Sequence, residues 1–140
     1  MSGYGTCRLA IAQLKPTEEV DAAHVRAVAA DMERDGVQRC PILVERQTMA
    51  ILDGHHRYHA ARSLGLAAIN AVLIGYDDPR LTLASWREVS YSRDDVLRAA
   101  ASGALLPAKS TRHILNPAVQ DMPVPLDDLS RAPGGGRPIP

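Results

Sequence analysis

Residues 51–62 read Ile-Leu-Asp-Gly-His-His-Arg-Tyr-His-Ala-Ala-Arg. An apolar run typical of a buried strand ends at Asp53, and helical spacing begins directly after Gly54. The glycine permits the tight turn that such a junction needs. Backbone N–H groups at a helix N-terminus point outward with a positive dipole, which favours phosphate. The stretch therefore predicts a strand, a turn and a helix that together bind phosphate.

The side chains of this junction suit the same chemistry. Arg57 offers a planar, permanently charged fork for phosphate oxygens. Gly54 lets the backbone approach an anion closely. Asp53 can hold Mg²⁺, which prefers one or two carboxylates plus nucleotide phosphates.

Two simpler interpretations compete at this junction. Asp53 can merely cap the helix, with His55 and His56 as ordinary polar residues of its first turn. A zinc site is the second alternative, because His55 and His59 share one helix face. Zinc needs three or four close ligands, and the remaining candidates show no paired spacing: Cys7, Cys40, His24 and His113.

The flanking sequence predicts a single α/β domain with a small sheet. Asp21 is a good N-cap and Gly36 stands where a helix C-cap belongs, so we expect a helix between them. Seven of the ten prolines fall at or after Pro107, which predicts an extended last third. The other expected elements are strands at 8–14, 41–44, 49–52, 69–74 and 81–89, and helices at 56–64 and 94–101. We expect one domain over 1–130 and a disordered Gly/Pro-rich tail over 131–140.

Composition limits the class of protein. The 140 residues carry 16 basic and 16 acidic side chains, so the net charge is zero with histidine neutral. A general nucleic-acid binder would show a basic excess. The sequence shows neither a membrane span nor a signal peptide's apolar core, so we expect a cytoplasmic protein. Aromatic residues are 4% with no Phe, which predicts an aliphatic core.

Three motifs in order resemble a known family. Residues 41–44 (PILV), a short turn and residues 51–65 (ILDGHHRYHAARSLG) look like the ParB/sulfiredoxin-like fold, in which a Gly-x-x-Arg turn binds phosphates. Within that fold, DGHHR resembles the free L-serine kinases, including the archaeal ADP-dependent and staphyloferrin B types. Residues 14–19 (LKPTEE) and 109–113 (KSTRH) resemble two further segments of that family. The resemblance covers about residues 8–129.

This resemblance implies a fold and an activity. The fold would be a compact single-domain ParB/sulfiredoxin-like α/β fold, with a small mixed sheet flanked by helices. The activity would be phosphorylation of the hydroxyl of free L-serine to O-phospho-L-serine, with ATP or ADP and Mg²⁺. The partners would then be these small molecules, with no nucleic acid or membrane, in a monomer or homodimer.

The resemblance also assigns roles to residues. Glu18 would be the catalytic base, with Glu19 as its neighbouring alternative, and either glutamate alone would be read as a solvated loop acid. Asp53 would hold the metal. The phosphate-binding residues would be Asp53, Gly54, His55, His56 and Arg57. The serine-binding residues would be Trp86, Ser110, Thr111, Arg112 and His113, although Ser110 or Thr111 can equally form a turn and Trp86 can be core.

A regulator is the alternative from a different class. It would be a ParB-like nucleotide-binding regulator or adaptor without kinase activity. About forty residues follow Ala101, which is too short for the helix-turn-helix domain of ParB partition proteins. A sulfiredoxin-type reductase is excluded on chemistry, because His55 stands where that family has its reactive cysteine. Glu18 together with the 110–113 motif favours the kinase, since a nucleotide switch needs no amino-acid pocket.

Overall fold

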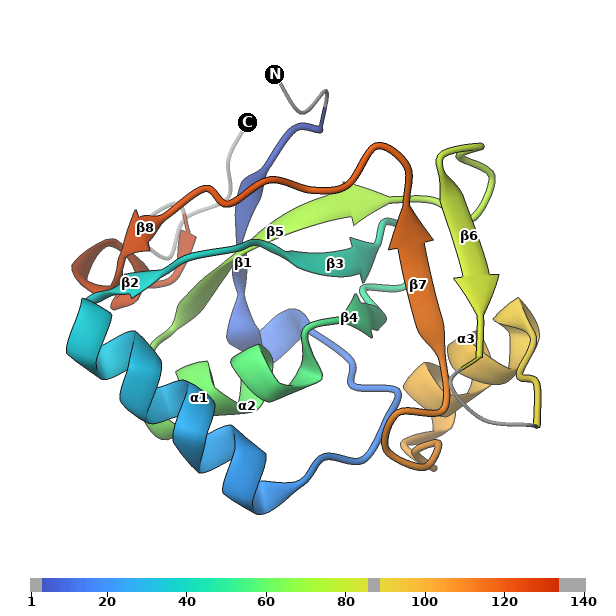
Figure 1. Cartoon of the computed structure of the whole chain (residues 1–140), viewed down its shortest axis with the longest axis horizontal. Coiled ribbons are helices and arrows are strands. Elements are labelled where there is room, and N and C mark those ends of the chain that lie inside the picture. The colour runs from blue at the N-terminus through green and yellow to red at the C-terminus, as the bar shows by residue number, and fades with distance from the viewer. Residues whose placement is uncertain (1–3, 86–88, 134–140) are drawn as a thin grey trace.

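A four-stranded mixed sheet forms the centre of the computed structural model, which describes residues 4–85 and 89–133. Its strand order is β1-β5-β3-β4, with β3 parallel to β5 and the other neighbours antiparallel. The strands of this sheet are β1 (Cys7–Ala10), β3 (Ile42–Glu45), β4 (Ile51–Asp53) and β5 (Ala68–Ile74). The expected mixed α/β class is confirmed (Figure 1).

Helices and two small ribbons surround this sheet. The helices are α1 (Ala22–Asp35), α2 (His55–Ser63) and α3 (Arg93–Ser102), with 3₁₀ turns η1 (Ile11–Gln13) and η2 (Leu126–Leu129). One antiparallel ribbon pairs β6 (Leu81–Ala84) with β7 (Arg112–Leu115), and the other pairs β2 (Val37–Gln38) with β8 (Val124–Pro125). None of the described helices is long and apolar enough to cross a membrane.

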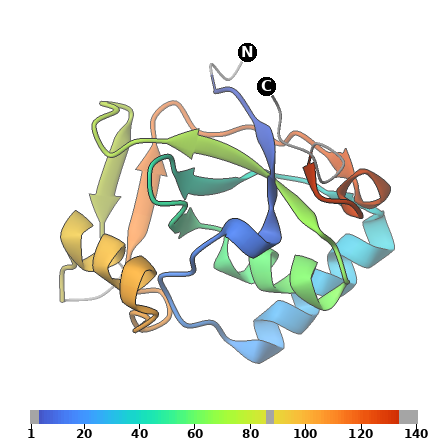
Figure 2. The ribbon, with the colours of Figure 1, turned by 180° about the vertical axis from the view of Figure 1, so that it is seen from behind.

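Alternating side chains of the sheet build two cores. On β3, Ile42 and Val44 belong to the core under α1 and α2, while Leu43 belongs to the opposite one. That second core includes Val96 of α3 and Leu115 of β7. Successive side chains of a strand point to opposite faces, so β3, β4 and β5 each contribute to both cores. Figures 1 and 2 show the two opposite sides of this arrangement.

The expected helix between Asp21 and Gly36 is confirmed by its caps. Asp21 Oδ1 accepts the N–H of Ala23 at 2.9 Å, and Gly36 takes the left-handed conformation at φ 73°. The first caps a free donor of the helix start and the second ends the helix without a Cβ clash. The expected strands at 41–44, 49–52 and 69–74 and helices at 56–64 and 94–101 are also confirmed, with ends shifted by one or two residues.

Two expected strands are shorter than predicted, and some strands were not predicted. The strand expected at 8–14 stops at Ala10, because the chain turns into η1 where the Ile11 N–H donates to the Ala67 carbonyl at 3.0 Å. The strand expected at 81–89 ends at Ala84, and residues 86–88 lie outside the described part. Strands β2, β7 and β8 were not expected. Of the expected tail, residues 134–140 lie outside the description.

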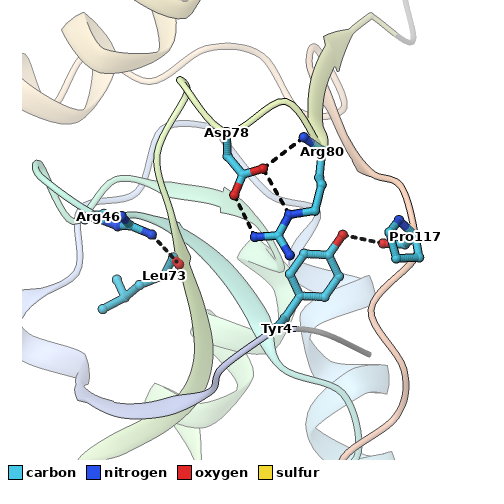
Figure 3. Close-up of polar contacts among 6 residues, drawn as sticks. All are labelled: Tyr4, Arg46, Leu73, Asp78, Arg80 and Pro117. Atoms are coloured by element: carbon cyan, nitrogen blue, oxygen red, sulfur yellow. Dashed lines mark hydrogen bonds and ion pairs between the residues drawn. The ribbon is translucent and has the colours of Figure 1, made fainter. Parts of the chain in front are cut away.

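The N-terminal segment holds the β6–β7 ribbon in place (Figure 3). The Tyr4 hydroxyl donates to the Pro117 carbonyl at 2.5 Å, just beyond the end of β7. The Arg80 guanidinium lies 4.5 Å from the centre of the Tyr4 ring and binds Asp78 at 2.7 Å. Those hydrogen bonds from Arg80 lower the pKa of Asp78 to about 2. The start of β6 and the end of β7, which pair at one end of the ribbon, are thereby tied to the start of the chain.

Gly54 is a residue at which the packing of a neighbouring strand leaves no room for a side chain. It has φ 103°, and a Cβ there would lie 2.4 Å from Ile42 Cγ2. We expect Gly54→Ala to lower the free energy of unfolding by roughly 2–5 kcal/mol, from backbone strain and overpacking together. Gly103→Ala is the matched control, because Gly103 has φ 76° but open space around it. We expect the control to cost about 1–2 kcal/mol. Urea denaturation measures both, and equal losses would contradict this account.

Candidate active site

A cavity of about 380 Å³ opens where the start of α2 faces the segment that precedes α1. It is bounded by β4 and α2 on one side, by α1 on another, and by the residues before β7. The residues that line it are Glu18, Glu19, His24, Val28, Leu52, Asp53, Gly54, His55, His56, Arg57, Lys109 and Thr111. We call it the first cavity.

Glu18 is held at the wall of this cavity by the far end of the chain. Its Oε1 accepts the Lys109 N–H at 3.1 Å, and its Oε2 accepts the Thr111 N–H at 3.0 Å. The Thr111 hydroxyl also donates to Oε2. A carboxylate has about four lone-pair positions, so Oε1 keeps one for a further proton donor. Glu19 is exposed, whereas Glu18 is buried, so the structure favours Glu18 as the positioned acid.

His55 connects the start of α2 to the Glu18 segment. Its Nε2 accepts the N–H of Thr17 at 3.0 Å and the N–H of Glu18 at 3.2 Å. Two donors at Nε2 place the ring proton of the neutral imidazole on Nδ1. Burial lowers the pKa of His55 to about 3, so the ring is neutral at pH 7. Only its Nδ1–H remains for the phosphate contact expected from the sequence.

His56 packs against α1 in a similar way. Its Nε2 accepts the Asp21 N–H at 3.4 Å, and its ring lies 4.1 Å from the ring of His24. Partial burial lowers the pKa of His56, and the neighbouring His24 acts in the same direction. Both imidazoles line the first cavity. The two rings therefore form an imidazole wall of the first cavity.

The start of α2 presents backbone donors to the cavity. The first hydrogen bond of the helix runs from the Tyr58 N–H to the Gly54 carbonyl at 2.9 Å. The N–H groups of residues 55–57 precede it and have no carbonyl within the helix. Arg57 directs Nη1 to the carbonyls of Cys40 and Pro41, both at 2.8 Å, which leaves Nε and Nη2 as further donors. This arrangement suits an anion.

Asp53 is the carboxylate that can hold a divalent cation here. Its side chain is 64% exposed at the rim, and Oδ2 lies 3.8 Å from Arg57 Nη2, beyond hydrogen-bond distance. Within residues 4–85 and 89–133, no three His, Cys, Asp or Glu side chains gather as metal ligands. Mg²⁺ takes only one or two carboxylates when phosphates and water supply the other ligands. Asp53 is therefore the residue of this rim that could supply such a carboxylate.

A second cavity of about 260 Å³ adjoins the first, since Asp53 and Arg57 line both. Arg112 and His113 of β7 line this second cavity. His113 is buried, its Nε2 lies 2.7 Å from the Tyr76 hydroxyl, and burial lowers its pKa to about 4. Its Nδ1 has no hydrogen-bond partner among the described residues.

The expected site residues thus divide into groups. Glu18, the five residues 53–57 and Thr111 share the first cavity, while Arg112 and His113 face the second. Ser110 is fully buried and its hydroxyl donates to the Pro107 carbonyl at 2.6 Å, as in a turn. Trp86 lies outside the described residues.

The structure adds cavity residues that sequence reasoning did not assign. They are His24, Val28, Leu52 and Lys109. Lys109 stands directly before the 110–113 segment, so its place in that motif was an available signal. The other three come from the body of a helix or strand, where nothing in the local pattern marks them.

The chain is similar to two curated archaeal proteins. It is 36% identical over 89 residues to a ParB-like protein of Sulfolobus acidocaldarius, and 30% identical over 78 residues to an ATP-dependent L-serine kinase of Staphylothermus marinus. These matches cover 64% and 53% of the chain, but only 44% and 31% of the two relatives. The chain thus spans less than half the length of either relative. No family model matches it.

A solved structure of a free serine kinase with AMP superposes with a TM-score of 0.83 over 90% of this chain and 94% of the other. The sequence identity is 13%, so this likeness concerns the fold. A variant of that kinase has been solved with ADP. The compact α/β fold expected from the motifs is confirmed, and it matches the fold of a free serine kinase over 90% of this chain.

The neutral ring of His55 predicts a loss of stability in acid. Unfolded His55 takes up a proton below its ordinary pKa of 6.5, whereas the folded ring stays neutral until about pH 3. The free energy of unfolding then falls across this window by up to about 1.4 kcal/mol per pH unit. Glutamine can place an acceptor near the position of Nε2 without titrating, so His55→Gln flattens this slope.

His59→Gln is the control, because His59 is only half-buried and bonds neither Thr17 nor Glu18. We expect it to retain most of the acid slope. Urea titrations at pH 4.5, 5.5 and 6.5 give the slopes, and a His55→Gln variant with the parent's slope would contradict the assignment.

Proposed function

We propose that this chain is a free L-serine kinase that transfers the terminal phosphoryl group of a nucleotide to the serine hydroxyl. The observation that carries this proposal is a single cavity in which a buried carboxylate faces the donors of a helix N-terminus. The similarity to an L-serine kinase sequence and to the fold of a free serine kinase supports the same activity. We assign the kinase domain to residues 1–130.

The phosphate end of the nucleotide lies, in this proposal, against the amides of residues 55–57. Arg57 adds its Nε and Nη2 donors, since its Nη1 already donates to the carbonyls of Cys40 and Pro41. Asp53 would hold Mg²⁺ at the rim, where the ion would supply charge neutralisation for the phosphates. His55 acts mainly by fixing the Glu18 segment at its distance from these amides.

Glu18 is the base of the proposed reaction. Its Oε1 takes the proton of the serine hydroxyl while the serine oxygen forms a bond to the terminal phosphorus. The bond from that phosphorus to its bridging oxygen breaks, and the nucleotide leaves with one phosphate fewer and the electron pair. Thr111 is a positioning residue, since both its amide and its hydroxyl donate to the Glu18 carboxylate.

The second cavity completes the serine site in this proposal. Arg112 directly follows Thr111 and faces that cavity, so a serine whose hydroxyl reaches Glu18 extends its carboxylate past Thr111 toward a guanidinium. His113, with a buried Nδ1 and a hydrogen bond to Tyr76, forms part of the same wall. We place Trp86 in this pocket only through the family resemblance.

The kinase function is tested by O-phosphoserine formation. The protein is incubated with Mg²⁺, L-serine and either ADP or ATP, and the product is measured by mass spectrometry. We expect product from the parent and a loss of roughly 10²–10⁴-fold in kcat for Glu18→Gln, which removes general-base catalysis. Glu19→Gln is the matched control and retains most of the parent rate, because Glu19 is exposed and the hydrogen bonds from residues 109 and 111 go to Glu18 instead.

Two results would count against this proposal, the first against the kinase function and the second against the base. Nucleotide binding without any O-phosphoserine would reject the kinase and favour a ParB-like nucleotide-binding regulator or adaptor. Equal losses in both glutamate variants would keep the kinase but remove the special role of Glu18.

A further inference from the structure

We propose that the ammonium group of Lys109 contacts the transferred phosphoryl group and neutralises its charge during transfer, an inference that rests on the kinase function proposed above. The residue lines the first cavity together with Glu18 and Arg57. The chain has two lysines and fourteen arginines, and this is the lysine that stands in the cavity.

The backbone of Lys109 ties this residue to the base. Its N–H donates to Glu18 Oε1 at 3.1 Å, which is the carboxylate oxygen with a remaining lone pair. The side chain therefore starts from the peptide unit that orients the base. A flexible four-carbon stem can carry the ammonium from there to an anion on the opposite wall. The same hydrogen bond would thus place both the base and a cation beside one reacting centre.

The conformation of Lys109 is unusual for its residue type. Its φ is 56°, in the left-handed region that residues with a Cβ seldom occupy. Among the described non-glycine residues only Met49 shares a positive φ. Such conformations persist where the surroundings enforce them, and they gather at functional sites. Here the enforcing contacts are the bonds of Glu18 to residues 109 and 111.

Electrostatics also places the Lys109 charge near the phosphate-binding residues. Burial is the main cause of the lowered pKa of His56, and the charges of His24 and Lys109 act in the same direction. Lys109 forms no ion pair with a carboxylate of residues 4–85 or 89–133. An ammonium with three donors and no protein counter-ion suits an anionic ligand. In phosphoryl transfer, charge spreads over the equatorial oxygens, where a point charge stabilises it.

A chemical footprint tests the contact without using the activity. Acetylation of the folded protein by an N-hydroxysuccinimide ester is followed by mass spectrometry at Lys109 and at Lys15. Lys15 is exposed and outside the first cavity, so it is an internal control. With Mg²⁺ and the donor nucleotide we expect Lys109 to be protected several-fold and Lys15 to be unchanged. AMP, which lacks the transferable phosphate, protects Lys109 much less. Equal protection by AMP and the donor would overturn the proposed contact.

Substitutions test the contribution to the rate. We expect Lys109→Met to lower kcat roughly 10²–10³-fold, the size found when one preorganised stabilising group is removed. Lys109→Arg restores part of that loss because it keeps the charge. Lys15→Met is the matched control and keeps the parent kcat. A Lys109→Met variant with parental kcat would overturn the proposal and leave the kinase function intact.

A third variant is the control for an effect of the substitution on folding. Glycine is comfortable at φ 56°, so Lys109→Gly should melt no lower than Lys109→Met while losing the same activity. A parent protein that forms no O-phosphoserine, yet protects Lys109 with the donor nucleotide, would overturn the kinase function and the catalytic part of this inference together. Recovery of activity by Lys109→Gly would also contradict a role for the side chain.

Discussion

The two N–H groups that His55 Nε2 accepts, from Thr17 and Glu18, hold the site together. They fasten the segment before α1 to the first turn of α2, so the acid and the helix N-terminus keep a constant separation. The contact requires a neutral imidazole, because a protonated Nε2 cannot accept. Burial maintains that state by lowering the pKa of the ring. A residue that the motif suggests as a phosphate ligand thus serves first as an architectural acceptor.

The segment before β7 is joined to the rest of the site by Glu18. Its carboxylate accepts donors from residues 109 and 111, which stand more than ninety positions later in the chain. Strand β7 follows these donors and pairs with β6, and the N-terminal Tyr4 contacts both Pro117 after β7 and Arg80 before β6 (Figure 3). Moving the buried Glu18 carboxylate away from its three donors would cost free energy, because those donors would lose their hydrogen bonds in a site with little water. The base is therefore positioned by tertiary structure rather than by its own loop.

Local patterns predicted much of this fold, because the determinants are local. Caps at Asp21 and Gly36, and the strand, turn and helix over 51–65, follow from residue type and spacing alone. Strand β7 was not predicted, because a four-residue strand in a proline-rich segment is too short to show a clear alternation of apolar and polar residues. Glu18 entered the candidate site through family resemblance only. Its pairing with Thr111 is a long-range contact, for which no single-sequence pattern exists.

The site also shows where type-based assignment is too coarse. His55 and Arg57 are phosphate-binding residue types, yet each spends part of its hydrogen-bonding capacity on backbone groups of the fold. Lys109 belongs to the 109–113 motif but received no role from it, because no local pattern shows that its N–H donates to the Glu18 carboxylate. In both cases the missing information is the identity of the partner, which the chain supplies only after folding. The donors that remain after these internal bonds define the chemistry available to a ligand.

The most direct test of this account is a crystal structure of the Glu18→Gln variant with ADP, Mg²⁺ and L-serine. The account predicts the terminal phosphate at the amides of residues 55–57 and the serine hydroxyl about 3 Å from the residue 18 side chain. The serine oxygen should stand in line with the terminal phosphorus and its bridging oxygen. A nucleotide bound away from the start of α2, or a serine confined to the second cavity out of reach of residue 18, would contradict it.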